Sequence, residues 1–551
     1  MRTISSNFSK KIIFIIVATL ISVGFFLRLV NLGQLPSVMH RDELAIAYNT
    51  YSILETGLDE WGEAYPVIFK SFGDYKLPGL IYSTILGIKF FGLTVLGSRV
   101  VAAVLASLAV PMMFFFTQEL YKSRFISLVS TIFLVFSFWH ISGSRNIYEP
   151  VVALSLSIPS YLFLFKAVKN TKYLFLSILF FAISIWFYHT PLFIYPLMFI
   201  LWIGYNWNRL SNKVKGWWGI AFILIIIVSS FNFFAVSTLN KSRSETTILM
   251  SQELKDTHQT TMHKYWSVGV PLHPLFTTAE RTFQLSYYFV QGYVKGISPD
   301  FVFFTGGNNY WHNLRPIGFG NVNPVLLPLS ILGLVYVLKN RKESSSYFLL
   351  CLLVLSPIPN ALTVDSPNIN RLIDFHFLVL VLSAIGLYSF YSFRLVKESL
   401  LSRLRKIALI LFVLVYIILT GQFLASYFLI YNSSLHSTWN EGFPELMENV
   451  EEYRGDYDKV IISTQTPEAY IFFLFYSKYL PQNIQNQNKD DSHTQKIGNV
   501  YFGADLGNID LDKESVLFVT SAKQEHKDST FIVRDWEGKP IWQGYELEDF
   551  D

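Results

Sequence analysis

Long apolar runs constrain this 551-residue chain more than any other feature of its sequence. The segments Ile12–Val30, Phe125–Ile141 and Ile407–Ile430 each approach the ~20 residues that a helix needs to cross the hydrocarbon of a bilayer. Lipid offers no hydrogen bonds to the backbone, so such runs are predicted to be helices. Hydrophobic residues make up 52% of the chain and charged residues only 15%, a balance that disfavours a soluble globular protein. We therefore expect an all-α polytopic membrane protein.

Lysine and arginine residues gather in alternate connections between the apolar runs, which gives the chain a direction across the membrane. Basic loops favour the cytoplasmic side, and placing all of them there puts the N-terminus in the cytoplasm and the C-terminal region outside. Residues 78–92 are left over, and we expect them to form a short helix in the outer interface. The eleven spans that this assignment predicts are 12–30, 96–121, 125–143, 147–166, 173–188, 191–207, 217–236, 324–338, 346–362, 372–393 and 407–430.

The predicted outer side holds a first loop (31–95), a second loop (237–323) and an acidic tail. We expect a transmembrane module over residues 1–431 and an extracytoplasmic domain over residues 432–551. Alternating β-branched and aromatic residues predict strands in the tail, and hence a small soluble α/β domain. These strands are Lys459–Ser463, Ser515–Thr520 and Thr530–Val533, and Asn483–Ser492 between them has the composition of a flexible linker.

Polar residues of the first loop lie at the predicted membrane boundary. Asp42 and Glu43 follow the first span, and Asp74 and Lys76 precede the interfacial helix. A carboxylate can act as a base and an ammonium can clamp a phosphate, so these residue types suit chemistry on a phosphorylated substrate. The alternative is a solvated loop whose charges simply stay in water.

Other outer span ends carry ionisable groups of the same kind, namely Arg145, His189 and Arg371. Ionisable residues at span ends are candidates for function. An arginine such as Arg99 can also snorkel to the interface, and a histidine can simply be hydrogen-bonded there. Because these groups fall on one predicted side of the membrane, they could meet above the helix bundle.

Several motifs resemble the GT-C glycosyltransferases, and within them the bacterial branch related to protein O-mannosyltransferases and the lipid A aminoarabinose transferase. The resemblance covers roughly residues 10–393 and is strongest over the first loop. The motifs that carry it are Asp42-Glu43, Thr56-Gly57-x-Asp59-Glu60-x-Gly62, Phe72-Gly73-Asp74-Tyr75-x-x-Pro78, Arg99, Ser144-Arg145, Gly306-Gly307-Asn308-Asn309 with His312 and Gly320, and Pro367-Asn368-x-Asn370-Arg371.

The resemblance implies an inverting transferase that takes a sugar from a polyprenyl-phosphate donor and places it on an extracytoplasmic glycan, lipid or protein acceptor in the cell membrane. It makes residues 1–431 the catalytic module. The implied catalytic residues are Asp42, as general base, with Glu43 and Asp74; the implied phosphate-binding residues are Lys76, Arg145 and Arg371; and the implied acceptor or sugar contacts are Tyr75, His189 and His312.

The sequence departs from the aminoarabinose-transferase pattern in two places. In that pattern the lysine directly follows the acid and precedes two prolines, whereas here Tyr75 separates Asp74 from Lys76 and only Pro78 follows. The Asp-x-Asp acid that some relatives carry at the next outer turn is represented only by Arg145 and Glu149. The cofactor is therefore open: a divalent metal is compatible with the sequence and is not required by it.

Three alternatives remain open at this level. A transporter or flippase of cell-envelope substrates would also have many spans, although it usually places ionisable groups near the midplane. A membrane-anchored binding protein would work through its tail. An oligosaccharyltransferase would be expected to carry a larger outer domain with a Trp-Trp-Asp motif, whereas Trp217-Trp218 is followed by Gly219 on the predicted cytoplasmic side. No basic stripe predicts nucleic-acid binding.

Overall fold

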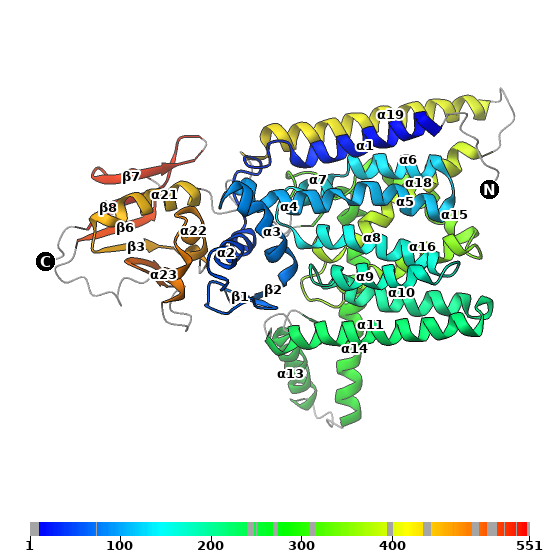
Figure 1. Cartoon of the computed structure of the whole chain (residues 1–551), viewed down its shortest axis with the longest axis horizontal. Coiled ribbons are helices and arrows are strands. Elements are labelled where there is room, and N and C mark those ends of the chain that lie inside the picture. Colours follow the sequence, from blue (N-terminus) through cyan, green and yellow to red (C-terminus); the bar gives the residue numbers. More distant parts are fainter. Residues whose placement is uncertain are drawn as a thin grey trace. The chain divides into compact units, whose positions relative to one another are not determined.

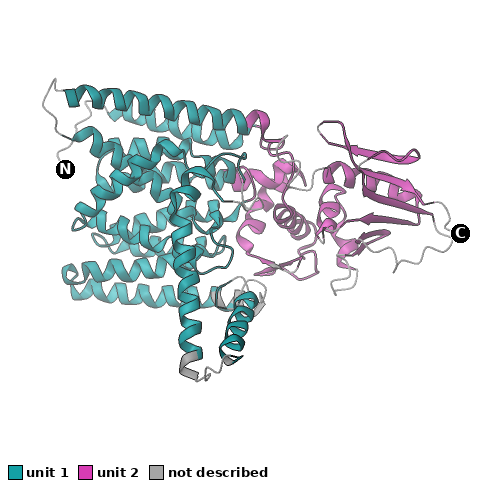
Figure 2. Ribbon diagram, turned by 180° about the vertical axis from the view of Figure 1, so that it is seen from behind, with its two compact units in different colours: residues 1–30, 104–144, 148–427 teal, residues 31–103, 145–147, 428–551 magenta. Residues whose placement is uncertain are grey.

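A computed structural model describes residues 10–72, 74–239, 247–249, 251–267, 274–307, 314–393, 400–432, 442–464, 466, 468–486, 495–503, 515–522, 524–535 and 537–547. The chain forms two compact units whose segments alternate along the sequence (Figure 2). Unit 1 comprises residues 1–30, 104–144 and 148–427, and unit 2 comprises residues 31–103, 145–147 and 428–551. The first loop therefore folds together with the tail, and the domain boundary at residue 431 stays a prediction.

Unit 1 is a bundle of helices (Figure 1). Its elements are α1 (Lys10–Leu29), α5 (Ala109–Tyr121), α6 (Arg124–Val135), α7 (Phe138–Ser144), α8 (Glu149–Ala167), α9 (Lys172–Ser184), α10 (Thr190–Asn206), α11 (Asn212–Leu239), α13 (Gln252–Ser267), α14 (Pro274–Ile297), α15 (Leu327–Lys339), α16 (Ser344–Leu355), α17 (Ile358–Ala361), α18 (Ile373–Ser392) and α19 (Leu400–Ala425). Helix α4 (Val95–Ser107) begins in unit 2 and ends in unit 1.

The membrane character of the bundle is confirmed, while the number of spans stays a prediction. Every predicted span falls on a helix. Within the described residues, seven helices are long and apolar enough to cross a bilayer, or eight if α6 and α7 form one bent span. The remaining three predicted spans fall on α9, α10 and residues 324–339, which are shorter. At 1.5 Å per residue, a 13-residue helix such as α9 covers only about 20 Å of a ~30 Å hydrocarbon core.

Helices α8 and α18 form the centre of the bundle. The most apolar stretch is 83% buried in α8 and 78% buried in α18, but only 17% buried in α1, α11 and α19. Apolar side chains on the outer helices thus stay uncovered by protein, as expected of helices whose solvent is lipid.

The α15–α18 pair packs backbone to backbone through two glycines. A Cβ atom on Gly386 would lie 1.9 Å from the carbonyl oxygen of Leu329, and one on Gly333 would lie 1.9 Å from that of Leu382. Small residues at such crossings let membrane helices approach closely, which maximises their van der Waals contact. No larger side chain fits at either position unless the helices separate.

We expect the substitution Gly386→Leu to destabilise the bundle by more than about 3 kcal/mol, because overpacking here meets backbone rather than a flexible side chain. The matched control is Gly421→Leu on α19, where an added Cβ meets no atom within 4 Å. Thermal stability in detergent, followed by size-exclusion chromatography, would measure both variants. Equal melting of the two would contradict the close α15–α18 packing.

The predicted span 125–143 is bent rather than straight, because α6 ends at Val135 and α7 leaves it at an angle of 55°. A break of this kind frees carbonyl groups inside the bundle. Arg28 of α1 is fully buried and donates hydrogen bonds to the carbonyl oxygens of Leu134 (3.0 Å) and Val135 (3.3 Å), and to Nδ1 of His140 (3.0 Å). The buried guanidinium thus satisfies the end of α6 and fixes the bend.

Unit 2 contains the predicted α/β domain, and its strands are confirmed. A six-stranded sheet has the order β4-β5-β3-β6-β8-β7, with β3 parallel to β5 and β6 and the other pairs antiparallel. Helix α22 is almost wholly buried and packs against α21. The tail elements are α21 (Phe443–Tyr453), β3 (Lys459–Ser463), α22 (Ala469–Tyr476), α23 (Pro481–Gln485), β4 (Lys496–Ile497), β5 (Val500–Gly503), β6 (Val516–Ser521), β7 (Ser529–Arg534) and β8 (Pro540–Glu546).

The first loop supplies the rest of unit 2. It forms α2 (Arg41–Thr56), a hairpin of β1 (Phe69–Ser71) and β2 (Asp74–Lys76), and α3 (Pro78–Phe91). The expected short helix is therefore present, although its place in the interface stays a prediction. Its exposed residues are Leu86, Lys89, Phe90 and Phe91, so three large apolar side chains and one cation are uncovered, which fits a helix at a membrane interface.

Candidate active site

The first two predicted acids lie in the first turn of α2. His40 caps this helix: its Nδ1 accepts a hydrogen bond from the backbone N–H of Asp42, while Oε2 of Glu43 accepts one from the backbone N–H of His40. This reciprocal cap fixes where α2 begins. Negative charges are also favoured at a helix N-terminus by the helix dipole. The local sequence therefore both starts the helix and places two carboxylates at its end.

Lys76 returns to Asp42 through the β1–β2 hairpin. Pairing of Phe69 with Lys76 closes the hairpin, and the Nζ atom of Lys76 lies 2.6 Å from Oδ1 of Asp42. The side chain of Lys76 is 5% exposed, whereas that of Asp42 is 36% exposed. The lysine is thus held within the protein and the carboxylate remains accessible to a substrate.

The environment of Asp42 keeps it ionised. Partial burial by itself raises the pKa of Asp42, but the Lys76 ammonium and the His40 ring outweigh this and hold that pKa well below its usual range. Asp42 therefore stays a carboxylate through the neutral range, ready to accept a proton or a hydrogen bond.

A second cation lies near the same place. The Arg41 guanidinium is 5.6 Å from the centre of the Phe72 ring, and the Lys76 ammonium is 5.3 Å from it, so one aromatic ring is flanked by two cations. Arg41 also pairs with Glu468, which precedes α22 in the tail. Phe72 and Arg41 thus connect Lys76, the partner of Asp42, to Glu468 of the tail.

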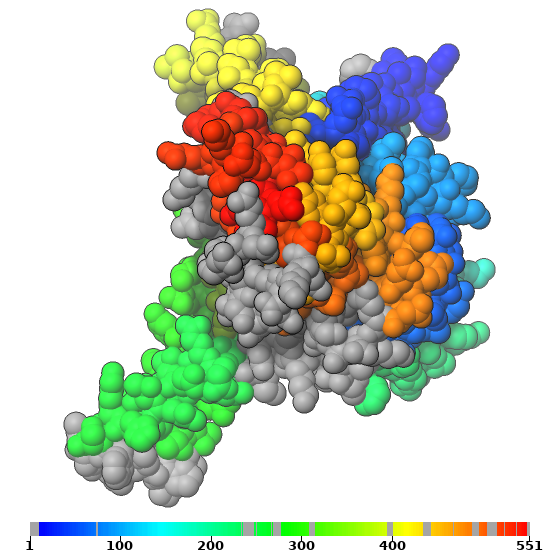
Figure 3. Space-filling model, turned by 90° about the vertical axis from the view of Figure 1, so that its left-hand side faces the viewer, coloured from blue at the N-terminus to red at the C-terminus, as the bar shows by residue number. Residues whose placement is uncertain are grey.

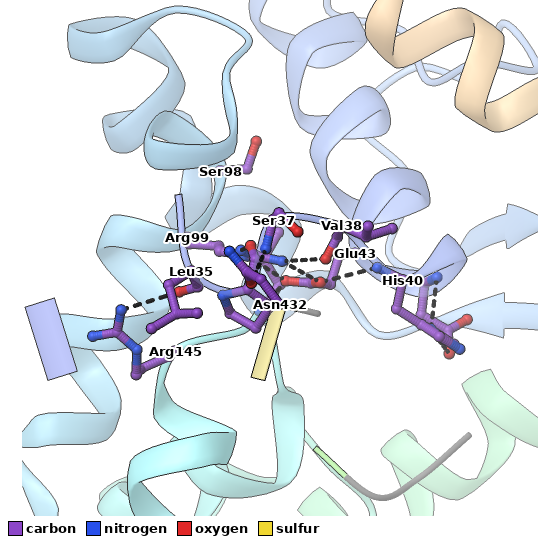
Figure 4. Close-up of polar contacts among 12 residues, drawn as sticks. Leu35, Ser37, Val38, His40, Glu43, Ser98, Arg99, Arg145 and Asn432 are labelled. Carbon is purple, nitrogen blue, oxygen red and sulfur yellow. Dashed lines mark hydrogen bonds and ion pairs between the residues drawn. The ribbon is translucent and has the colours of Figure 1, made fainter. Parts of the chain in front are cut away.

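Glu43 is held differently from its neighbour, as Figure 4 shows. It is 2% exposed and accepts two hydrogen bonds from Arg99, Nε to Oε1 and Nη2 to Oε2, each 2.9 Å long. The backbone N–H of Ile147 donates to the same carboxylate at 2.8 Å. Arg99, itself fully buried, donates further to the carbonyl oxygens of Pro36 (2.6 Å) and Val38 (3.0 Å). The Glu43–Arg99 pair therefore ties three separate segments of unit 2 to the start of α2.

Arg145 is also fully buried. Its Nη2 atom donates to the carbonyl oxygen of Leu35 at 3.0 Å, and its guanidinium lies 5.0 Å from the centre of the Phe428 ring (Figure 4 shows the Leu35 contact). It belongs to the same three-residue segment as Ile147, which contacts Glu43. In this structure Arg145 therefore braces the segment before α2.

Helix α23 of the tail and the residues just before it contact the C-terminal half of α2. Nε2 of Gln485 lies within hydrogen-bonding distance of Ser52 Oγ (2.8 Å), Thr56 Oγ1 (3.0 Å) and the carbonyl oxygen of Asp59 (2.9 Å). The hydroxyl of Tyr48 donates to the carbonyl oxygen of Tyr479 at 2.8 Å. The predicted flexible linker is therefore wrong at its start, because residues up to Gln485 form α23 against α2, while residues 487–492 lie outside the described residues.

Replacing Gln485 with alanine is expected to lower the free energy of local unfolding at the end of α2 by about 1–3 kcal/mol. The hydroxyl and carbonyl groups of α2 and of the turn after it would lose this donor. Amide hydrogen exchange over residues 48–60 would report the change. Gln482→Ala is the matched control, because Gln482 is exposed on the same short helix. The same increase in exchange in both variants would contradict a specific contact by Gln485.

The Asp59-Glu60 motif forms the turn after α2. Gly57 ends the helix with a φ of 75°, a conformation that suits glycine. Glu60 is buried, its Oε1 accepts a hydrogen bond from Asn49, and burial raises its pKa to about 8. Burial likewise raises the pKa of Asp59 to about 6. Glu60 is thus largely protonated at neutral pH. The Asp59-Glu60 motif stabilises the turn after α2 and does not add a second carboxylate beside Asp42.

The remaining predicted residues lie elsewhere or outside the description. Tyr75 alternates with Lys76 along β2, so its side chain leaves the opposite face of the strand. His189 and Arg371 belong to unit 1: His189 precedes α10, and Arg371 pairs with Asp365 in the turn before α18. The side chain of Asp74 and the whole of His312 lie outside the described residues.

Sequence reasoning assigned no role to four residues that hold this site together, namely Arg41, Arg99, Glu468 and Gln485. For Arg99 the signal was present, since it is a lone arginine in an apolar segment, but snorkelling explained it equally well. Glu468 and Gln485 lie more than 400 residues from their partners in the chain, and nothing in their own neighbourhood indicated a contact. Across the described part of the chain, no three His, Cys, Asp or Glu side chains lie together as a metal site would need.

Solved structures resemble this fold over most of its length, although no family model and no curated protein matches the sequence. ArnT from Cupriavidus metallidurans, bound to undecaprenyl phosphate, superposes with a TM-score of 0.55 at 11% identity, over 98% of this chain and 98% of that chain. The apo form of that protein gives a TM-score of 0.54 at 9% identity.

The archaeal oligosaccharyltransferase AglB from Archaeoglobus fulgidus, in complex with an inhibitory peptide and a dolichol-phosphate, has a TM-score of 0.52 at 13% identity. That match covers 86% of this chain, which spans only 64% of the length of AglB. Both are GT-C enzymes, and the ArnT match extends over the bundle, the first loop and the tail alike. The chain therefore shares the polytopic membrane fold of these two proteins.

Proposed function

We propose that the protein is a glycosyltransferase that moves a hexosyl or pentosyl group from a polyprenyl-phosphate donor to an extracytoplasmic acceptor. The observation that carries this proposal is the Asp42–Lys76 pair, in which an accessible carboxylate is held ionised beside a buried ammonium. A base and a phosphate-binding cation side by side are what transfer from a sugar phosphate requires.

In the proposed reaction, Asp42 accepts the proton of an acceptor hydroxyl while that oxygen attacks the anomeric carbon of the sugar. The bond between the anomeric carbon and the phosphate oxygen breaks, and its electron pair leaves with the polyprenyl phosphate. The configuration at the anomeric carbon inverts. Lys76 stabilises the charge that develops on the phosphate, which needs no general acid because it is already a good leaving group.

Donor binding would also activate the base. A carboxylate with a lowered pKa is a weak base, so the resting Asp42–Lys76 pair is not the best state for proton transfer. A phosphate that takes over the hydrogen bonds of Lys76 leaves Asp42 with less positive charge beside it. The pKa of Asp42 then rises when the donor is bound, and its basicity increases at the moment when it is needed.

The other predicted residues enter the proposal with smaller parts. Glu43 keeps both oxygens occupied by Arg99, Ile147 and His40, so we assign it to positioning α2. Arg371 and Arg145 remain proposed phosphate ligands, and Asp74, Tyr75, His189 and His312 remain proposed contacts to acceptor or sugar. The solved ArnT and AglB structures hold undecaprenyl phosphate and dolichol-phosphate, which supports a lipid-phosphate donor.

A transfer assay separates this proposal from a transporter or flippase. Purified full-length protein in vesicles would receive a polyprenyl-phosphate sugar labelled in the sugar, together with an envelope extract as acceptor. We expect the label to move to the acceptor and unlabelled polyprenyl phosphate to accumulate. Label that only crosses the bilayer on an intact donor would contradict the enzyme and favour the transporter.

Because the acceptor should be extracytoplasmic, externally added protease should reach the tail in right-side-out vesicles.

The substitution Lys76→Gln should shift the pH dependence of transfer. Lys76 holds the pKa of Asp42 below its usual range, so wild-type protein keeps its base ionised as the pH falls. Without the ammonium, partial burial raises the pKa of Asp42. As the pH is lowered, transfer by the variant should therefore begin to decline at a higher pH than transfer by the wild type. The acidic limb of the profile of kcat/KM against pH reports this pKa in the free enzyme. Superimposable acidic limbs in both proteins would contradict the coupling.

A further inference from the structure

Helix α14 in the second outer loop presents an apolar stripe that no described residue covers. Phe283, Tyr287, Val290 and Val294 are 73%, 55%, 57% and 56% exposed. They recur every three or four residues and therefore lie along one face of the helix. In water, a row of this kind would be costly on a solvent-facing helix.

The opposite face of α14 holds it against the bundle. Gly292 lies about two and a half turns after Phe283, which places it on the other side of the helix. Its carbonyl oxygen accepts hydrogen bonds from Asn360 Nδ2 and Ser366 Oγ, each 3.0 Å long. A Cβ on Gly296, one turn later, would lie 2.6 Å from the same Asn360 nitrogen. The stripe consequently faces away from the bundle.

The direction of α14 suggests what covers the stripe. Figures 1 and 2 show α14 running across the long helices of the bundle rather than along them. Figure 3 shows the α13–α14 hairpin, in green, projecting from the rest of unit 1. If the long helices cross the membrane, a helix that runs across them lies along the membrane plane, where an apolar stripe can enter the acyl region.

A pocket between α13 and α14 has the charge for a lipid headgroup. Its volume is about 200 Å³, and its lining includes Lys255, Arg281 and His258 together with Leu254 and Leu285, but no carboxylate. His258 pairs with Glu280, which stands outside the lining. Among the described residues, neither Lys255 nor Arg281 forms an ion pair. Two uncompensated cations beside leucine side chains suit an anionic amphiphile.

We propose that the α13–α14 hairpin lies on the outer leaflet and binds an anionic phospholipid. Lys255 and Arg281 hold the phosphate of the headgroup, and Leu254 and Leu285 contact the adjoining part of the acyl chains. The stripe of Phe283, Tyr287, Val290 and Val294, on the other face of α14, lies among the acyl chains of the surrounding leaflet. This proposal goes beyond the transfer reaction and uses none of its residues. It rests on the proposed membrane orientation only for the choice of leaflet.

Spin labelling tests the position of the stripe. Cys351 is the only cysteine of the chain, so a Cys351→Ala background allows one label at a time. Val290→Cys places the label on the stripe, and Thr282→Cys places it on an exposed position of a different face. In bilayers, the label at 290 should collide more with oxygen, which enters hydrocarbon, and the label at 282 more with a water-soluble nickel chelate. Greater nickel accessibility at 290 than at 282 would overturn the proposal.

Lipid binding tests the pocket. Native mass spectrometry of the delipidated full chain should show phosphatidylglycerol adducts in preference to phosphatidylcholine adducts. The double variant K255Q/R281Q should lose about 10-fold or more in phosphatidylglycerol affinity, since two charge-assisted hydrogen bonds are removed. The control K264Q/K295Q removes the same charge from exposed positions outside the lining and should keep the affinity.

Three outcomes of that experiment would overturn the proposal. They are equal affinity for the two lipids, equal loss in both double variants, and displacement of the bound lipid by excess inorganic phosphate, which would make the pocket a site for free anions. A transfer assay on K255Q/R281Q separates this inference from the proposed function, because lipid affinity should fall while transfer from saturating donor continues.

Discussion

Replacing Asp42 with asparagine is expected to lower the transfer rate about 100- to 10,000-fold, the range that a positioned general base contributes. Asparagine keeps the shape of the side chain and its place in the first turn of α2, but its amide cannot accept the proton of an attacking hydroxyl. The variant also loses the ion pair with Lys76, whose buried ammonium must then be held by other acceptors. Expression level and melting temperature should be measured together with the rate, to show that the variant is folded.

Glu55→Gln is the control for this experiment, because Glu55 lies exposed on the same helix and its substitution also removes one carboxylate. It should transfer at the wild-type rate. Normal transfer by a folded Asp42→Asn protein would remove Asp42 from the mechanism. A large loss in Glu55→Gln as well would show that the charge of α2 matters rather than the base.

Substituting Arg99 with methionine is expected to destabilise unit 2 by about 3–5 kcal/mol, the usual cost of leaving one buried charge without its partner. Glu43 would keep its donors from Ile147 and His40 but lose the two hydrogen bonds of the guanidinium, and the carbonyl groups of Pro36 and Val38 would lose theirs. Thermal melting in detergent measures the effect. Arg124→Met, at an exposed position at the start of α6, is the control and should melt like wild type.

A double substitution distinguishes a broken ion pair from a damaged core. The variant E43L/R99M removes both buried charges and should recover part of the stability lost in Arg99→Met, because no unpaired charge remains. Its transfer activity should stay low, since α2 is no longer tied to the segments before it and Asp42 loses its fixed position. Full activity in the double variant would contradict the positioning role of Glu43 and Arg99.

The sequence predicted the features that depend on local chemistry. Apolar runs require helices in lipid, so helices appear where the spans were predicted, and β-branched runs such as Lys459–Ser463 appear as strands. Asp42, Glu43 and Lys76 were recognised together because they lie in one loop. Their pairing was not predicted, since it depends on the register of the β1–β2 hairpin, in which Phe69 lies opposite Lys76.

The features that were missed depend on contacts across the whole chain. The contacts of Glu468 and Gln485 in the tail with α2 were not predicted. Such partners are set by tertiary packing, which leaves no periodic pattern in one sequence. The bend between α6 and α7 was missed for a similar reason, because the hydrogen bonds of Arg28 that stabilise it come from another span.

The most direct test of the central claim is the affinity of Asp42→Asn for the polyprenyl-phosphate donor, measured on the same preparation as its transfer rate. If Asp42 is the base and Lys76 holds the phosphate, removing the carboxylate frees the lysine for the donor. Donor affinity should then stay the same or rise while transfer collapses. An affinity that falls in step with the rate, or a rate that survives, would contradict the account.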